Sequence, residues 1–292
     1  GPVALKLSGW VAPLSEHIDH QLALTCKKLK WPLKGDPEWV VSRAEIKSRG
    51  NLDKLRLDLS SLLSGQAIPD IDLSARVQGN LKEVSVKKLT AKTLAGEISL
   101  TGLLKLADEM MWQGKLSLNN IDTNSLYPDY PAQLNGELSH QFTLQKAHWQ
   151  LAVDKLDLHG QFMHQPLKVT GKVSGNDRLE WDIQDLAVIN GANKISATGK
   201  IKQQFDLLLN LNAPSLASSL PDVAGSLHGR IKVAGDLTAP KVNADLVGEN
   251  LAVGELSMAQ LTLKGDVIAS EQPSGKLDLS ISQLTQPGVD IE

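Results

Sequence analysis

The chain has 292 residues, with 30 basic and 33 acidic side chains, 41% hydrophobic residues and only 4% aromatic residues. Neither half carries the basic stripe that nucleic-acid binding requires. The single cysteine, Cys26, excludes an internal disulfide and a cysteine-rich metal site, and no run of eighteen apolar residues is present to span a membrane as a helix. The scarcity of Phe and Tyr favours a long repetitive structure over a compact enzyme core.

The two ends of the chain predict a piece of a longer protein. Gly1-Pro2 resembles the scar of tag removal, and the chain stops inside an alternating pattern at Val289 and Ile291. We therefore expect residues 1–2 to be a tag-cleavage scar and native targeting signals to lie outside this sequence.

Apolar residues recur at every second position along almost the whole chain. A period of two places successive side chains on opposite faces of a β-strand, whereas the i, i+3, i+4, i+7 spacing of an amphipathic helix is nearly absent. Counting such runs predicts roughly sixteen to eighteen strands, each with one apolar and one polar face. The clearest runs are residues 55–59, 71–77, 98–106, 227–233 and 277–281.

Turn signals punctuate these runs at short intervals. Where they lie between adjacent runs they predict hairpin loops, and short loops require antiparallel neighbours. The predicted architecture is therefore an antiparallel meander. The signals are Gly79-Asn80, Asn119-Asn120, Gly175-Asn176-Asp177, Asn190-Gly191, Gly248-Glu249-Asn250 and Pro273-Ser274-Gly275.

Internal repeats occur at long range. Residues 96–105 resemble 193–202, and residues 127–138 resemble 221–231; Ile68-Pro69-Asp70 begins a third copy of the latter element. We expect residues 3–292 to form one continuous array of repeats near 95 residues with no sharp internal boundary. Residues 215–220 and 122–127 are each expected to form one helical turn before a proline.

So many strands cannot remain one flat open sheet, because twisted sheets of more than about ten strands curl or split. We predict an all-β fold: a long antiparallel meander curved into a U-shaped trough (β-taco) with an apolar interior and at most short helical turns. Glycines in phase with the apolar positions permit this bending. The alternative is a sandwich in which the apolar faces pack on each other. These glycines are Gly102, Gly114, Gly136, Gly160, Gly171, Gly199, Gly229 and Gly265.

Residues 225–246, GSLHGRIKVAGDLTAPKVNADL, carry the most specific pattern. An alternating strand ends in Gly-x-Leu-x-x-Pro, and the next strand opens as x-Val-x-Ala-x-Leu. Together with LPDVAGSLHG before it, this stretch resembles the repeats of the TamB family, within the wider AsmA-like group. The segments YPDYPAQLNGEL and ISLTGLLK resemble divergent copies.

The resemblance implies a large envelope protein of Gram-negative bacteria, anchored in the inner membrane and crossing the periplasm. The family is similar to the bridge-like lipid transfer proteins, whose curved sheets hold lipid tails in a groove. It also implies an outer-membrane barrel partner of the TamA type, bound through regions outside this chain, and a link to barrel assembly. We expect this chain to be an internal periplasmic segment.

We expect the apolar interior to shield phospholipid acyl chains, which satisfy apolar surface without needing hydrogen bonds. The predicted groove lining is Leu73, Val77, Ile98, Leu100, Leu104, Leu116, Leu118, Leu134, Leu138, Phe142, Leu151, Val153, Leu158, Val169, Val173, Trp181, Ile183, Ile195, Ile201, Leu207, Leu209, Leu227, Ile231 and Val233. The alternative function is a scaffold or chaperone for outer-membrane β-barrel proteins that acts by β-augmentation at sheet edges. A polysaccharide-binding β-solenoid would need aromatic stripes on the polar face, which are absent.

No pattern predicts catalysis, a metal or a cofactor. The histidines lack acidic or cysteine partners at metal-ligand spacing, and Cys26 has no histidine placed beside it by a motif. Carboxylate pairs such as Asp154/Asp157 and Asp182/Asp185 occupy polar faces or turns, where solvated acids are expected. No phosphate-binding loop or nucleophile elbow is present, so we expect a protein that is not an enzyme and uses no cofactor.

Overall fold

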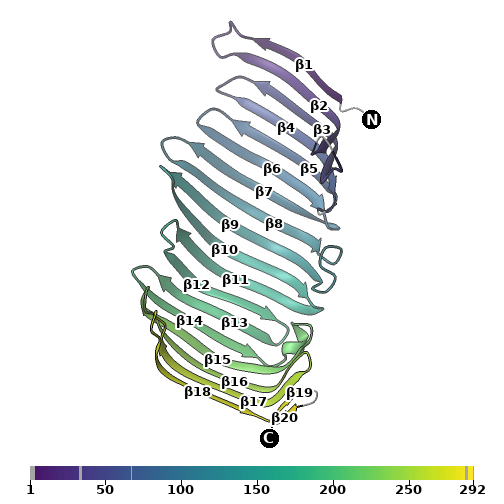
Figure 1. Cartoon of the computed structure of the whole chain (residues 1–292). Coiled ribbons are helices and arrows are strands. Elements are labelled where there is room, and N and C mark those ends of the chain that lie inside the picture. The colour runs from purple at the N-terminus through teal and green to yellow at the C-terminus, as the bar shows by residue number, and fades with distance from the viewer. Residues whose placement is uncertain (1–3, 33–34, 67, 287–288, 292) are drawn as a thin grey trace. The chain divides into compact units, whose positions relative to one another are not determined.

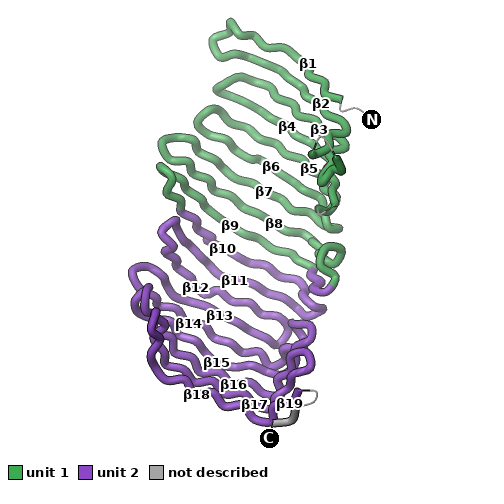
Figure 2. Tube along the Cα trace, in the orientation of Figure 1, with its two compact units in different colours: residues 1–128, 133–149 green, residues 129–132, 150–292 purple. Residues whose placement is uncertain are grey.

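The structure is a computed structural model that describes residues 4–32, 35–66, 68–286 and 289–291. It divides into two compact units (Figure 2). Unit 1 comprises Gly1–Pro128 and Gln133–Trp149, and unit 2 comprises Asp129–Ala132 and Gln150–Glu292. The expectation of one continuous array over 3–292, without a sharp boundary, stays a prediction.

Unit 1 is a single antiparallel meander in which each strand pairs with the next strand in the chain (Figure 1). Its strands are β1 (Ala4–Ala12), β2 (Asp19–Trp31), β3 (Trp39–Gly50), β4 (Leu55–Gly65), β5 (Ile71–Gly79), β6 (Glu83–Thr93), β7 (Gly96–Leu106), β8 (Met110–Asp122) and β9 (Ala132–Gln145).

Unit 2 repeats this arrangement, with antiparallel neighbours in chain order up to β18 (Figure 1). Two short strands complete it, with β19 bonded to β17 and to β20. Its strands are β10 (His148–Phe162), β11 (Gln165–Asn176), β12 (Trp181–Asn190), β13 (Asn193–Ile201), β14 (Gln204–Ala213), β15 (Val223–Asp236), β16 (Lys241–Val253), β17 (Leu256–Ile268), β18 (Ser274–Ser282), β19 (Leu284–Gln286) and β20 (Val289–Ile291).

The predicted all-β antiparallel meander is confirmed. The described residues form 20 strands, slightly more than expected, and two of them, β19 and β20, are only three residues long. Neither unit closes on itself among the described residues, since β1 pairs with β2 alone and β18 with β17 alone. An open antiparallel sheet of this kind is consistent with the predicted curved trough.

Most predicted turns connect strands as expected. The Asn80 side-chain oxygen accepts hydrogen bonds from the backbone N–H groups of Lys82 and Glu83, both at 2.8 Å. Asn176 does the same for Arg178 at 3.0 Å and Glu180 at 3.2 Å. These side chains stabilise tight β5–β6 and β11–β12 hairpins by supplying the acceptors that the turning backbone lacks.

Two predicted turns are wrong, because their residues lie inside strands as β-bulges. Asn119-Asn120 belongs to β8 and Gly248-Glu249-Asn250 belongs to β16. Asn120 and Asn250 adopt positive φ angles of 52° and 49°. Asparagine tolerates this left-handed conformation, so it accommodates an extra residue in a strand as readily as it accommodates a hairpin turn.

The bulges change whether odd-numbered or even-numbered residues of a strand face the apolar side. In β2 the apolar positions run to Cys26 and resume at Leu29, with Lys28 between them at φ 58°. In β16 the phase changes at Asn250, where the register with β15 shifts by one residue. The bulges therefore keep the apolar side chains of long strands on one face while the strand twists.

Two glycines on the apolar side show why the strands can bend. Gly199 and Gly229 have φ angles of 131° and 145°, which side-chain-bearing residues rarely adopt. A Cβ atom would lie 1.9 Å from the Asp206 carbonyl oxygen at Gly199 and 2.0 Å from that of Asp245 at Gly229. Strands β15, β16 and β17 are bent along their length within unit 2 (Figure 1).

The two predicted helical turns differ in detail. Leu216–Ser218 forms the 3-10 helix η1, as expected. Residues 122–127 form a turn closed by a 2.9 Å hydrogen bond from the Tyr127 N–H to the Thr123 carbonyl, without a helix.

Helix η1 is fastened to the β12–β13 hairpin by a buried asparagine. The Asn193 amide nitrogen donates to the Ser215 carbonyl and the Ser219 hydroxyl, both at 2.7 Å, and its oxygen accepts the Ser215 N–H at 3.1 Å. Buried polar groups of this kind are retained where their hydrogen bonds are satisfied. The η1 segment therefore covers one end of the β12–β13 pair.

Candidate functional site

The strand register places every predicted groove residue of unit 1 on one face of its sheet. Residues directly opposite each other in antiparallel strands project to the same side. Leu100 lies opposite Leu116, and Leu116 lies opposite Leu138, so β7, β8 and β9 share a continuous apolar row. We call this side of each sheet the apolar face and the other side the polar face. The predicted residues on it are Leu73, Val77, Ile98, Leu100, Leu104, Leu116, Leu118, Leu134, Leu138 and Phe142.

Unit 2 has the same organisation. Leu207 lies opposite Val233, and Leu209 lies opposite both Ala197 and Ile231. The fourteen predicted residues of this unit also share one face. They are Leu151, Val153, Leu158, Val169, Val173, Trp181, Ile183, Ile195, Ile201, Leu207, Leu209, Leu227, Ile231 and Val233.

The apolar face of each unit has no covering layer among the described residues. None of the predicted residues is buried, and Ile195 and Leu209 are 47% and 37% exposed. No described side chain is fully buried. Within each unit the substantial contacts join strands adjacent in the sheet, apart from the η1 contact with β15. The apolar faces are thus single-layered rather than the two halves of a sandwich core.

The apolar face extends beyond the predicted residues. The first strands of unit 1 and the last strands of unit 2 contribute to it through the same cross-strand pairing. Alternation signalled these strands, and in β2 and β16 the phase changes at Lys28 and Asn250 obscured which positions lie on the apolar face. The added residues include Leu7, Leu24, Ile46, Leu57, Leu59, Leu246, Leu263 and Leu279.

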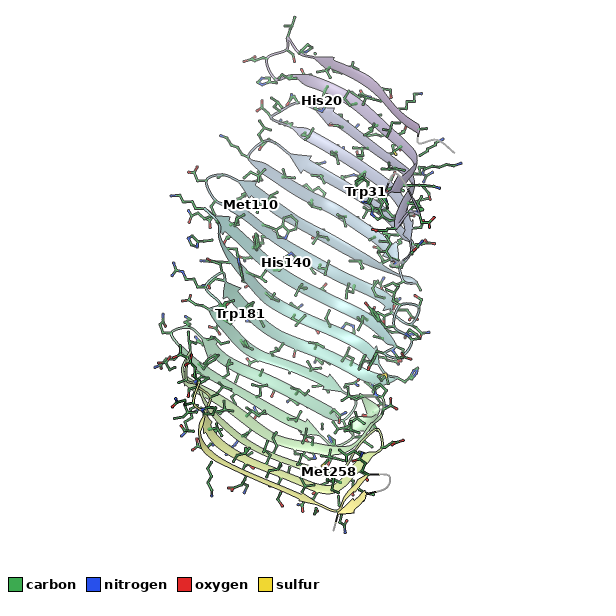
Figure 3. The ribbon with its side chains drawn as sticks, in the orientation of Figure 1. His20, Trp31, Met110, His140, Trp181 and Met258 are labelled. Atoms are coloured by element: carbon green, nitrogen blue, oxygen red, sulfur yellow. The ribbon has the colours of Figure 1, made fainter. Side chains whose placement is uncertain are left out.

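Two tryptophans lie flat on the apolar face. Gly102 and Gly114 face each other across β7 and β8. A Cβ atom would lie 2.5 Å from the Trp112 ring if added at Gly102 and 2.7 Å from it if added at Gly114. At Gly175 it would lie 2.4 Å from the ring of Trp181, which Figure 3 labels on β12. The glycines leave room for the rings to cover the backbone, so these tryptophans widen the apolar surface instead of forming a recognition cage.

His140 on β9 is a polar group on the apolar face of unit 1 (Figure 3). It lies opposite Gly114 of β8. Its Nε2 atom accepts a 2.8 Å hydrogen bond from the Trp112 indole N–H, and the two rings are 6.2 Å apart. His140 lies between the predicted lining residues Leu138 and Phe142, so alternation alone places it on this face. Its contact with Trp112 follows from the β8–β9 register, which one strand by itself does not reveal.

The polar faces carry the charges, arranged as cross-strand pairs. Lys115 lies 2.7 Å from Glu137 in unit 1, and Lys200 lies 3.0 Å from Asp182 in unit 2. The hydrogen bond from Lys200, with a second from Gln184, lowers the pKa of Asp182 below its ordinary value of 3.8. A carboxylate held ionised in this way is a poor general acid at neutral pH.

Neither a metal site nor a membrane-spanning helix is found in the described part of the chain. No three His, Cys, Asp or Glu side chains of residues 4–32, 35–66, 68–286 or 289–291 gather to hold a metal ion. Cys26 is buried as a free thiol. None of the helices in that part of the chain has the length and apolarity needed to cross a bilayer.

The family described as TamB, N-terminal domain, matches residues 1–292. The Haemophilus influenzae protein named translocation and assembly module subunit TamB is 27% identical over 249 residues, covering 85% of this chain and 19% of the relative. An uncharacterized protein of Buchnera aphidicola is 20% identical over 203 residues, covering 70% of this chain and 19% of the relative.

The chain thus spans about a fifth of the length of these curated relatives. No solved structure matches it. The family match extends over every residue that builds the two apolar faces, including the 225–246 repeat whose pattern resembles this family. The chain therefore belongs to the TamB family.

Proposed function

We propose that this chain is a segment of a periplasm-spanning bridge protein whose apolar faces shield phospholipid acyl chains during transport from the inner to the outer membrane. The observation that supports this proposal is a face of aliphatic residues, continuous by register across each unit and left uncovered by any other described part of the chain. An exposed apolar surface of this extent in a protein favours a lipid or protein ligand.

The energetics suit transfer rather than storage of a lipid. Burial of one CH₂ group contributes about 0.8 kcal/mol, so a 16-carbon tail gains on the order of 12 kcal/mol on leaving water. A bilayer offers nearly the same gain. Movement of a tail between the bilayer and the apolar face is thus close to neutral, and aliphatic side chains add no polar anchor that would hold it.

The proposal places the chain in the periplasm, in a protein anchored in the inner membrane of a Gram-negative bacterium. The name of the Haemophilus influenzae relative, translocation and assembly module subunit, supports a role in a module of that kind. The proposal includes a barrel partner of the TamA type, bound through regions outside this chain. We assign the chain no catalytic residue and no cofactor, since its function would reside in the shape and chemistry of the face.

The test is native mass spectrometry of the chain purified without detergent, with the bound lipids extracted and identified. We expect several phospholipids per chain in the wild type and few in Leu100→Asp, because a carboxylate on the apolar face opposes contact with acyl chains. The matched control is Thr101→Asp, which places the same charge one residue away, on the polar face and opposite Lys115.

Thr101→Asp is expected to keep its lipids. A wild-type chain that is stably folded and free of lipid would contradict the proposal, as would equal lipid loss in both variants.

A second candidate function, scaffolding of outer-membrane barrel assembly, is favoured by the edge strands. β1 is exposed along almost its whole length and pairs on one side only among the described residues. A free edge can add a strand from another chain. Lys6→Pro in β1 would impair this function, whereas Leu100→Asp would leave it intact, so the two variants separate the candidates in a barrel-assembly assay.

A further inference from the structure

The polar face of unit 1 contains a group of cations that its own acids do not balance. The group lies on β3, β4, β5 and β6 and comprises five basic residues with two acids among them. The acids are Asp58 and Glu45, which leaves an excess of three positive charges. The basic residues are Lys47, Arg49, Arg56, Arg76 and Lys88.

The strand register places basic residues directly opposite each other. Arg49 lies directly opposite Arg56, and Arg76 lies directly opposite Lys88. Like charges at directly opposed positions destabilise a sheet, because their side chains start about 5 Å apart. Neither pair is separated by an acid, so an external anion would relieve the repulsion.

The acids present are already engaged. Asp58 accepts a 3.0 Å hydrogen bond from the Arg76 guanidinium, and this bond lowers the pKa of Asp58. Glu45 lies 3.0 Å from the Lys47 ammonium. The Arg56 Nε atom is buried and makes no hydrogen bond, its nearest carboxylate oxygen being that of Asp58 at 3.6 Å. The charge of Arg49 acts on the same carboxylate, since it also lowers the pKa of Asp58.

A hollow of about 280 Å³ lies beside this group on the polar face. Its lining residues include Ser8, Gln21, Lys47, Arg49 and Asp58, from β1 to β4. The lining residues therefore include a hydroxyl, an amide and a guanidinium group, with two basic residues against one acidic residue. A phosphate group fits this set, because guanidinium forks bind phosphate oxygens in pairs and a hydroxyl or amide completes the shell.

Unit 2 provides an internal contrast. A hollow of similar size, about 320 Å³, lies on its polar face at β15–β18. There the row Arg230, Asp245, Lys264 and Asp278 alternates in sign from strand to strand. That hollow is lined by three basic and three acidic residues, so it has no excess charge to offer an anion.

We propose that the hollow at β1–β4, which Arg49 and Lys47 line and beside which Arg56 lies opposite Arg49, binds a phosphate group. The ligand is a phosphate-bearing anion, either free or as the headgroup of an anionic phospholipid. The site lies on the side of the sheet opposite the apolar face, so it is independent of whether that face carries acyl chains.

The test compares two double variants of the full chain that change the net charge equally, from −3 to −5. Arg49→Gln with Arg56→Gln removes the proposed site, and Arg230→Gln with Lys264→Gln removes two cations from the balanced hollow. Binding of inorganic phosphate is measured by calorimetry, and sedimentation is measured with phosphatidylglycerol–phosphatidylcholine vesicles and with phosphatidylcholine vesicles alone. The ionic strength is held near 20 mM with chloride, because salt screens exposed charges.

We expect saturable binding by the wild type and binding about tenfold or more weaker by Arg49→Gln/Arg56→Gln, because that variant loses at least one charge-assisted hydrogen bond to the phosphate. The control variant, Arg230→Gln/Lys264→Gln, loses no such bond and should bind nearly as well as the wild type. Binding of inorganic phosphate identifies the free anion as sufficient. Binding only to phosphatidylglycerol vesicles identifies the headgroup.

Two results would overturn the proposal. One is the absence of saturable binding by the wild type in both arms, and the other is an equal loss of binding in both double variants, which would reduce the effect to net charge.

Loss of fold is not expected in Arg49→Gln/Arg56→Gln, because the change removes a repulsion between the two guanidinium groups. Its thermal midpoint without phosphate should equal or exceed that of the wild type. Lys88→Gln, at the rim of the group, should weaken binding by a smaller factor.

Discussion

At the scale of single residues, the apolar faces contain tryptophan rings that lie over glycines. Trp112 covers the backbone of Gly102 and Gly114, and Trp181 covers Gly175. A large ring on a strand would normally stand up from the sheet beside its neighbours. With glycines opposite or beside it, the ring lies flat, which adds apolar area without closing the face.

Substitution of Gly114 tests this packing. Gly114→Ala would place a Cβ atom 2.7 Å from the Trp112 ring, so the ring must move and its hydrogen bond to His140 must break. We expect a loss of about 1–3 kcal/mol in the free energy of unfolding by urea, as for other overpacked sites. The emission of Trp112 should shift at the same time.

Gly265→Ala is the matched control, because Gly265 also faces the apolar side but has its nearest neighbour at 3.3 Å, the terminal methyl of Leu277. We expect a change within about 0.5 kcal/mol there. Equal effects at the two glycines would contradict the account of Trp112.

At the scale of elements, β-bulges let long strands keep one face apolar. Strands of 13 residues such as β2 and β16 twist enough that an uninterrupted period of two would turn their side chains away from the common face. One residue at positive φ, Lys28 or Asn250, resets the phase. Strand β16 thereby continues the apolar row at Leu251, which is 8% exposed.

The bulge in β16 predicts a clear order of stabilities. Asn250→Val should destabilise the chain by about 1–2 kcal/mol, because a β-branched side chain is costly at a φ of 49°. Asn250→Gly, which accepts that conformation, should be nearly neutral. Urea unfolding of both variants measures the difference. A valine variant as stable as the glycine variant would show that the residue does not need its left-handed conformation.

At the scale of the whole molecule, both units present the same kind of surface. Each is an open antiparallel sheet with one aliphatic face and one face of paired charges, and neither contains a second layer among the described residues. A lipid conduit built from such units would require the apolar face of every unit to stay free of charged side chains, since one charge would interrupt the path of an acyl chain.

A single charge in unit 2 should therefore abolish lipid transport by the full-length protein. Ile231→Arg is expected to block transport in cells that lack redundant transport pathways, because desolvation of a guanidinium opposes passage of a tail. Ser280→Arg adds the same charge on the polar face of β18, two residues from Asp278, and should transport normally. Lipid exchange between membranes is measured by isotope labelling. Full transport by Ile231→Arg would refute the conduit.

Much of the fold was predictable because it depends on local patterns. Alternation identified the strands, and asparagine and glycine identified hairpins such as those at Asn80 and Asn176. The same residue types misled at Asn120 and Asn250, since a left-handed residue serves a bulge and a turn equally well. The predicted lining residues lie on the apolar face because alternation within a run fixes their phase. Omitted residues such as Leu57 and Leu279 lie in equally regular runs, and their place on the common face follows from pairing with the neighbouring strands.

The sequence by itself determined that this protein is a meander of strands with one apolar and one polar face, and its repeats indicated the family. Only the tertiary structure decided that none of the residues it describes forms a second layer over the apolar faces and that Trp112 lies on two glycines. It also decided that Arg49 faces Arg56 while Arg230 faces Asp245. The reason is physical. Alternation is a property of one strand, whereas cross-strand neighbours depend on the register between two strands, and each bulge shifts that register by one residue.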